Sequence, residues 1–208
     1  MISNDLHGSQ EILFEGDIKS AKSAMILIHG RGSTAKSILT LTKEFNVDNY
    51  IYAAPQANGS TWYPYSFLSP LELNEPDLSS ALNAIDKLIK KLNDSGIPDS
   101  EIILLGFSQG ACLILEYGAR NAKKYKGIIG LSGALIGDKI DKSRYSGSFE
   151  KCPVFLGCSD NDPHIPEERV HQTAEVMDEL NASVTKRIYS GMGHTINEDE
   201  INFIRSVL

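Results

Sequence analysis

Gly106-Phe107-Ser108-Gln109-Gly110 is the stretch of sequence that decides the fold. It follows the apolar run 102–105, which has the length and composition of a buried strand, and it precedes a helix-forming stretch that ends at residue 120. At a strand-to-helix turn, a Gly-x-Ser-x-Gly sequence holds the serine in a strained backbone conformation that exposes its hydroxyl above the sheet. The context of the motif therefore predicts that Ser108 is a nucleophile.

A serine hydroxyl is a weak nucleophile at neutral pH, so a base must accompany it. Of the histidines that follow Ser108, only His194 lies in a glycine-rich loop, 190–195, after a predicted strand. Such a loop, at the carboxyl end of a strand, can bring a base to the nucleophile. His194 is therefore the predicted base. His171 falls within a polar helical pattern, and His164 is expected at the mouth of the site.

The base needs an acid to orient it, and the sequence offers more than one. Asp160 and Asp162 both lie in the loop after the strand-like run 154–158, and Asp138 is a third candidate on position alone. Pro163 rigidifies the loop next to Asp162 and cannot donate a competing backbone N–H. Asp160 suits a turn-closing role, which is common for aspartate in loops. Asp162 is therefore favoured, with the other two left open.

The turn His29-Gly30-Arg31-Gly32-Ser33 follows the apolar run 24–28 and supplies a fourth element. A His-Gly-x-Gly turn at this position offers backbone N–H groups to a developing oxyanion, beside the N–H that follows the nucleophile. We therefore predict an oxyanion hole made by the backbone N–H groups of Arg31 and Gln109. The alternative is a phosphate cradle with Lys36 nearby, but the Walker spacing of Gly and Lys is absent.

The segment 55–76 is rich in aromatic residues and prolines, which favours a wall of the substrate site over a regular core element. The alternative is a loop that packs its aromatic rings onto the domain. The Arg31 side chain has two interpretations: contact with an anionic group of the substrate, or pairing with an acid such as Glu72 or Glu75. We expect substrate contacts from His29, Gly30, Trp62, Tyr63 and Phe67.

Six short motifs together resemble the phospholipase/carboxylesterase family of α/β-hydrolases, which includes acyl-protein thioesterases and small bacterial carboxylesterases. The resemblance runs from Met25 to the C-terminus. It implies that Asp162 completes a triad with Ser108 and His194, in a compact hydrolase without a large cap domain. The motifs are His29-Gly-Arg-Gly, Pro55-Gln56, Trp62-Tyr63, Gly106-Phe-Ser-Gln-Gly, Asp162-Pro-His-Ile-Pro166 and Gly191-Met-Gly-His194.

Apolar runs alternate with amphipathic stretches along the chain, which predicts a mostly parallel sheet of about seven strands with helices on both faces. We expect this α/β architecture to form one domain over residues 1–208. The strand-like runs are 11–14, 24–28, 50–54, 102–107, 127–131, 154–158 and 183–189. The helical patterns are 35–45, 77–92, 108–120, 167–180 and 198–207.

Composition narrows the function classes. The formal charge of −7, without a basic cluster, argues against nucleic acid as a partner. No apolar run is long enough to span a membrane, and the N-terminus lacks the pattern of a signal peptide. Three cysteines without a CxxC motif fit a reducing compartment, so we expect a cytoplasmic protein. No cluster has zinc spacing, and we expect neither a metal nor a cofactor.

The sequence therefore predicts a serine hydrolase that cleaves carboxylic esters, including thioesters, of short to medium acyl chains through an acyl-enzyme intermediate. The expected partner is a small-molecule ester, without stable membrane association, and a homodimer is compatible with the sequence. The alternative substrates are those of an acyl-protein thioesterase or a lysophospholipase. A different class is a ligand-binding protein that keeps the fold and has lost turnover, because a fold alone does not establish activity.

Overall fold

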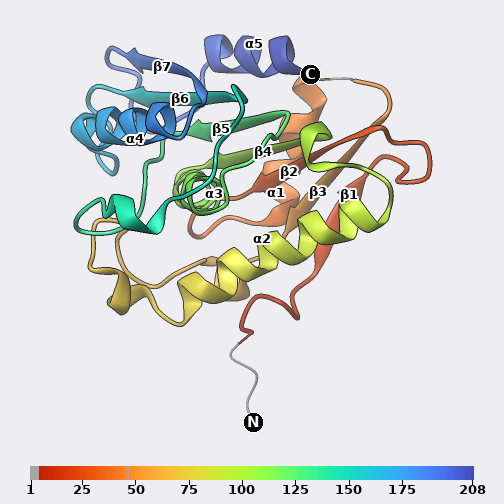
Figure 1. Cartoon of the computed structure of the whole chain (residues 1–208), viewed down its shortest axis with the longest axis horizontal. Coiled ribbons are helices and arrows are strands. Elements are labelled where there is room, and N and C mark those ends of the chain that lie inside the picture. The colour runs from red at the N-terminus through yellow and green to blue at the C-terminus, as the bar shows by residue number, and fades with distance from the viewer. Residues whose placement is uncertain (1–4, 46) are drawn as a thin grey trace.

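The computed structural model describes residues 5–45 and 47–208, so part of the N-terminal segment considered above lies outside it. The strands form one seven-stranded sheet in the order β1-β3-β2-β4-β5-β6-β7 (Figure 1). Strand β1 pairs antiparallel with β3, and all other neighbours pair in parallel. The strands are β1 (Ile12–Glu15), β2 (Ser23–Ile28), β3 (Tyr50–Pro55), β4 (Ile102–Phe107), β5 (Gly127–Leu131), β6 (Pro153–Ser159) and β7 (Ser183–Tyr189).

The central strands are buried because both of their faces are covered. Every residue of β2, β3 and β5 is buried, and so is all of β4 except its last residue, Phe107. Strand β7 lies at the edge of the sheet and has no buried residue. This contrast is expected of a parallel sheet, whose inner strands read as continuous hydrophobic runs. The predicted fold class, a mostly parallel sheet with helices, is confirmed.

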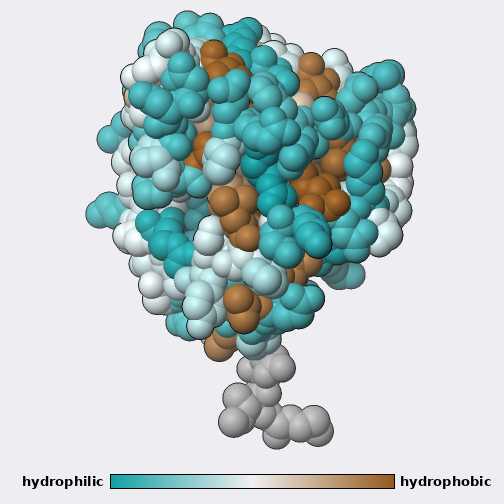
Figure 2. All heavy atoms as spheres, turned by 90° about the vertical axis from the view of Figure 1, so that its left-hand side faces the viewer, coloured by the Kyte–Doolittle hydropathy of each residue, from teal (hydrophilic) through white to brown (hydrophobic). Residues whose placement is uncertain are grey.

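Helices cover both faces of the sheet, and the sheet separates the hydrophobic core into two clusters. Buried side chains of α2, α3 and α4 belong to one hydrophobic cluster, whereas those of α1 and α5 belong to the other. On one face seen in Figure 2, hydrophobic residues gather in separate patches among hydrophilic ones. The helices are α1 (Ala35–Leu39), α2 (Asp77–Asp94), α3 (Gln109–Arg120), α4 (Glu167–Glu179) and α5 (Glu198–Val207).

One predicted helix is shorter than its sequence pattern suggests. The pattern 35–45 predicts a single helix, but α1 ends at Leu39 and a 3₁₀ helix, η1 (Thr40–Glu44), follows it. Thr42 Oγ1 donates to Leu39 O at 2.7 Å, and Thr40 Oγ1 donates to Ser37 O at the same distance. Threonine hydroxyls that bond to backbone carbonyls compete with regular helical hydrogen bonds, which accounts for the tighter turn.

Five loops meet at the carboxyl-terminal end of the sheet, because the strands that they follow, β2, β3, β4, β6 and β7, all run in the same direction. These loops contain the His-Gly-x-Gly turn, the aromatic segment, the nucleophile turn, the acid loop and the histidine loop. Within the part of the chain that the structure describes, no helix has the length and hydrophobicity that a bilayer-spanning segment needs.

Candidate active site

Ser108 occupies a strained turn between β4 and α3. Its backbone angles are φ 56° and ψ −121°, in a region that non-glycine residues seldom adopt. The turn is held on both sides, since Ser108 N donates to Leu131 O at 2.9 Å and Cys112 N donates to Ser108 O at 3.0 Å. A Cβ on Gly106 would overlap the backbone of Gly110, so this tight turn requires glycine there.

Ser108, His194 and Asp162 form a continuous chain of close polar contacts. His194 Nε2 lies 2.9 Å from Ser108 Oγ, and His194 Nδ1 lies 2.7 Å from Asp162 Oδ2. The Asp162 side chain is fully buried, and its Oδ1 accepts hydrogen bonds from the backbone N–H groups of His164 and Ile165. Burial raises the pKa of Asp162, but hydrogen bonds from His194 and these N–H groups lower it more, so its pKa lies below the usual value.

The structure separates the three aspartates that the sequence left as candidates for the acid. Asp162 alone of the three contacts His194. Asp160 is exposed, and its Oδ1 accepts a hydrogen bond from Gly191 N at 2.9 Å, which closes the histidine loop. Asp138 is also exposed, and its backbone carbonyl accepts a bond from Arg169.

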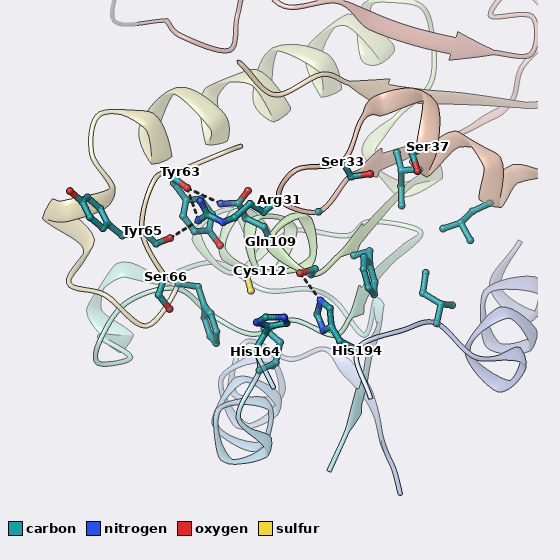
Figure 3. Close-up of a pocket in the computed structure, with 18 of the residues that line it drawn as sticks. Arg31, Ser33, Ser37, Tyr63, Tyr65, Ser66, Gln109, Cys112, His164 and His194 are labelled. Atoms are coloured by element: carbon teal, nitrogen blue, oxygen red, sulfur yellow. Dashed lines mark hydrogen bonds between the residues drawn. The ribbon is translucent and has the colours of Figure 1, made fainter. Parts of the chain in front are cut away.

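The contacts of the histidines also distinguish them from one another. His171 lies on α4, with Nε2 3.0 Å from Glu167 Oε1 and Nδ1 2.5 Å from Lys186 Nζ. His164 lies beside His194, with the two ring centroids 4.8 Å apart in an edge-on arrangement (Figure 3). An imidazole placed between a buried carboxylate and a hydroxyl can take a proton from that hydroxyl, and His194 has this position.

The His-Gly-x-Gly turn lies directly against the nucleophile. A Cβ built on Gly30 would be 3.3 Å from Ser108 Cβ, and one built on Gly110 would overlap the backbone carbonyl of Ile28. Among the described residues, the backbone N–H groups of Arg31 and Gln109 have no acceptor within hydrogen-bonding distance. Gln109 also begins α3, whose N-terminal end favours negative charge. Two such donors beside a serine hydroxyl can stabilise an oxyanion.

A pocket of about 770 Å³ opens over Ser108. Its size falls within the range of small-molecule sites, about 300–1,000 Å³. Figure 3 shows Tyr65 and Ser66 on one side of His194, and Ser33 and Ser37 on the other. The pocket is lined by Gly30, Arg31, Ser33, Ser37, Ile38, Thr40, Leu41, Tyr63, Pro64, Tyr65, Ser66, Phe67, Phe107, Ser108, Gln109, Cys112, His164, Ile165, His194 and Ile196.

Three of the five residues expected to contact substrate line this pocket: Gly30, Tyr63 and Phe67. Trp62 and His29 do not, and both are fully buried, so the expectation for these two is corrected. Trp62 Nε1 donates to His29 O at 2.8 Å, and His29 Nε2 accepts from Ala57 N at 3.1 Å. Both side chains hold the turn and the aromatic segment together. Burial accordingly lowers the pKa of His29, which favours the neutral ring.

The Arg31 side chain binds backbone carbonyls. Its guanidinium donates to Tyr63 O at 2.8 Å, Pro64 O at 2.9 Å and Tyr65 O at 2.7 Å. Within residues 5–45 and 47–208 it makes no ion pair with Glu72 or Glu75, so that expectation is replaced by three carbonyl contacts. Contact with an anionic group of the substrate stays a prediction, because Arg31 lines the pocket and the three bonds use three of the five N–H donors of its guanidinium.

Sequence reasoning missed two side chains that support the site. Gln109 Nε2 donates to Tyr63 O at 2.8 Å, and its Oε1 accepts from Trp62 N at 3.0 Å. His7 is buried beneath the same segment, with Nδ1 accepting from Asn58 N and Nε2 3.1 Å from Trp62 O. The available signal for Gln109 was its place in the nucleophile motif. His7 carried no signal, because its partners are backbone atoms more than 50 residues away.

Comparison with known proteins gives the family. The sequence profile of the phospholipase/carboxylesterase family matches residues 14–208. The chain belongs to the phospholipase/carboxylesterase family. It is thus a hydrolase of the esterase type, and the resemblance inferred from the motifs is confirmed.

Individual relatives agree with this assignment. A crystal structure of a phospholipase/carboxylesterase from Dyadobacter fermentans is 42% identical, with a TM-score of 0.93 over 96% of each chain. An acyl-protein thioesterase 1 from Saccharomyces cerevisiae is 28% identical over 92% of this chain and 93% of its own length. Its counterpart from Debaryomyces hansenii is 30% identical over 91% and 93%.

Proposed function

We propose that this phospholipase/carboxylesterase family member hydrolyses carboxylic esters of short to medium acyl chains through a serine-bound acyl intermediate. Ser108 Oγ attacks the ester carbonyl while His194 Nε2 takes the hydroxyl proton, and the same proton then passes to the departing alcohol. A water molecule, deprotonated by His194, then attacks the carbonyl carbon of the acyl-serine. The bond to Ser108 Oγ breaks, His194 returns the proton to Oγ, and the acid is released. Asp162 fixes the orientation of the imidazole and stabilises its protonated form.

The observation that carries the proposal is the contact chain from Asp162 through His194 to Ser108, with distances of 2.7 and 2.9 Å, in which Ser108 and His194 line the pocket. The backbone N–H groups of Arg31 and Gln109, assigned to the oxyanion, lack acceptors in the described part of the chain, which also supports it. Removal of one oxyanion donor typically costs about 10²–10³ in kcat.

The lining of the pocket supports a neutral ester of modest size. The residues that line the pocket include Tyr63, Phe67, Cys112 and Ile165, which are all buried and contribute apolar surface. Among the described residues that line the pocket there is no carboxylate, and the guanidinium of Arg31 binds three carbonyls. An apolar acyl group therefore finds contact area without losing a charged partner.

A panel of p-nitrophenyl esters from acetate to palmitate, run beside a lysophospholipid, tests the substrate class. We expect the highest kcat/KM on acetate to hexanoate, and the Ser108→Ala variant should be inactive on every substrate. Best activity on the lysophospholipid would instead establish that alternative. Absence of turnover on the whole panel, together with tight binding of an ester, would favour the ligand-binding protein.

A second candidate is thioester hydrolysis, because two relatives that cover more than nine-tenths of this chain are acyl-protein thioesterases. The same attack at a carbonyl would release a thiol in place of an alcohol. A short acyl-peptide thioester assayed beside the matching oxygen ester separates the two. A cytoplasmic location remains a proposal, based on Cys112, Cys152 and Cys158, which are buried free thiols.

A further inference from the structure

Arg31 and Gln109, the two residues assigned to the oxyanion, use their side chains to hold one and the same loop (Figure 3). The Arg31 guanidinium donates to the carbonyls of Tyr63, Pro64 and Tyr65 at 2.7–2.9 Å. Gln109 Nε2 donates to the Tyr63 carbonyl as well, at 2.8 Å. The Tyr63 carbonyl thus accepts hydrogen bonds from both residues.

We call residues 61–67 the wall loop, because five of its residues, Tyr63, Pro64, Tyr65, Ser66 and Phe67, line the pocket. The wall loop contains neither helix nor strand, so hydrogen bonds from other parts of the chain hold it in place, among them those of Arg31, Gln109, Asn74 and Gly137. Two more bonds join this region to the His-Gly-x-Gly turn. Gly32 N donates to Ser60 O at 2.8 Å, and the indole of Trp62 donates to His29 O at the same distance.

Only an arginine suits this arrangement. Three consecutive carbonyls need several N–H donors in a planar fork, which a guanidinium provides and a lysine ammonium does not. The guanidinium carbon also lies 5.9 Å from the centre of the Tyr63 ring, so the side chain contacts the loop through ring and backbone together. These bonds connect the pocket wall with the turn whose N–H is assigned to the oxyanion.

We propose that Arg31 is a positioning residue that couples the wall loop to the oxyanion turn, so that acyl-chain contact with the wall raises the rate of acyl transfer. This inference rests on the proposed function. An acyl chain long enough to reach the wall loop presses on the segment that fixes the turn, and its binding energy is expressed in the transition state. Binding energy used in this way raises kcat, whereas uniform binding would lower only KM.

The test compares kcat and KM for p-nitrophenyl acetate, butyrate and hexanoate in wild type, Arg31→Ala and Arg31→Lys. In wild type we expect kcat to rise with chain length. In both variants kcat should no longer depend on chain length, and kcat/KM should fall about tenfold more on hexanoate than on acetate, the effect of losing a charged hydrogen bond. Added guanidinium should restore the chain-length dependence of Arg31→Ala, but ammonium should not.

Arg205→Ala is the matched control, because Arg205 is an exposed arginine that also donates to a backbone carbonyl, Glu44 O, outside the pocket. It should behave as wild type. Equal losses of Arg31→Ala at all chain lengths, or wild-type behaviour of Arg31→Lys, would overturn the coupling and leave the proposed function standing. Absence of ester hydrolysis by the wild type would overturn both.

Discussion

Glu200 is a buried acid whose ionisation should weaken the fold, and Glu200→Gln is the change that tests this. Its side chain lies in the first turn of α5 and is fully buried against Gly157. One oxygen accepts from Asn197 N at 2.9 Å and completes a capping box, while Oε1 has no hydrogen-bond partner among the described residues. A glutamine keeps the cap acceptor and removes the charge.

The direction and size of the effect follow from the pKa. Burial raises the pKa of Glu200 from 4.5 to about 7, against the opposing bond from Asn197 N. The pKa of Glu200 is higher in the folded than in the unfolded protein. Below the unfolded value of 4.5 the carboxyl group is protonated in both states, so it does not lower the free energy of unfolding there. As the pH rises from the unfolded pKa to the folded pKa, the free energy of unfolding falls, and above the folded pKa the loss is complete. At 1.36 kcal/mol for each pKa unit, the full cost is roughly 3 kcal/mol.

Urea unfolding of wild type and Glu200→Gln at pH 5 and pH 8.5 measures this cost. The free energy of unfolding of the variant should exceed that of wild type by roughly 2–3 kcal/mol more at pH 8.5 than at pH 5. Glu198→Gln is the control, because Glu198 lies in the same helical turn with its side chain 71% exposed, and it should change by less than about 0.5 kcal/mol. The same difference between variant and wild type at both pH values would refute the reasoning.

Two further predictions concern the acid and the tight turns. Asp162→Asn should lower kcat by about 10³–10⁴, because the imidazole loses the carboxylate at its Nδ1. Asp160→Asn should lower kcat by less than about tenfold, because Asp160 only closes the histidine loop. Steady-state kinetics measures both values, and the reverse order would contradict the assignment. Gly110→Ala should prevent stable folding, since its Cβ would overlap the Ile28 carbonyl, whereas Gly32→Ala has open space and should cost about 1 kcal/mol in thermal unfolding.

The elements of the fold could be predicted because apolar runs mark the strands directly. The ends of β4, β5 and β7 agree with the patterns to the residue, and α2 runs only two residues further than its apolar stripe. The order of the strands could not be predicted in this way. It depends on pairing between distant segments, such as β1 with β3, and hydrophobic runs do not identify their neighbours.

The candidate site was predictable where chemistry restricts the residue type and unpredictable where a backbone atom is the partner. Ser108, Asp162 and His194 were found from motif context and order along the chain, and their roles remain predictions. The partners of Arg31 were missed, because a backbone carbonyl leaves no mark in the sequence. Trp62 was placed in the pocket by aromatic composition alone, yet its indole binds a carbonyl 33 residues away.

Covalent labelling of Ser108 tests the central claim most directly. A fluorophosphonate reacts with a serine only when a neighbouring base activates it, so the probe reports the contact between His194 and Ser108. By intact mass and peptide mapping, we expect one adduct on Ser108 in wild type and none in Ser108→Ala, which should keep the wild-type circular dichroism spectrum. An unlabelled wild type, or an equally labelled Ser108→Ala, would contradict the account.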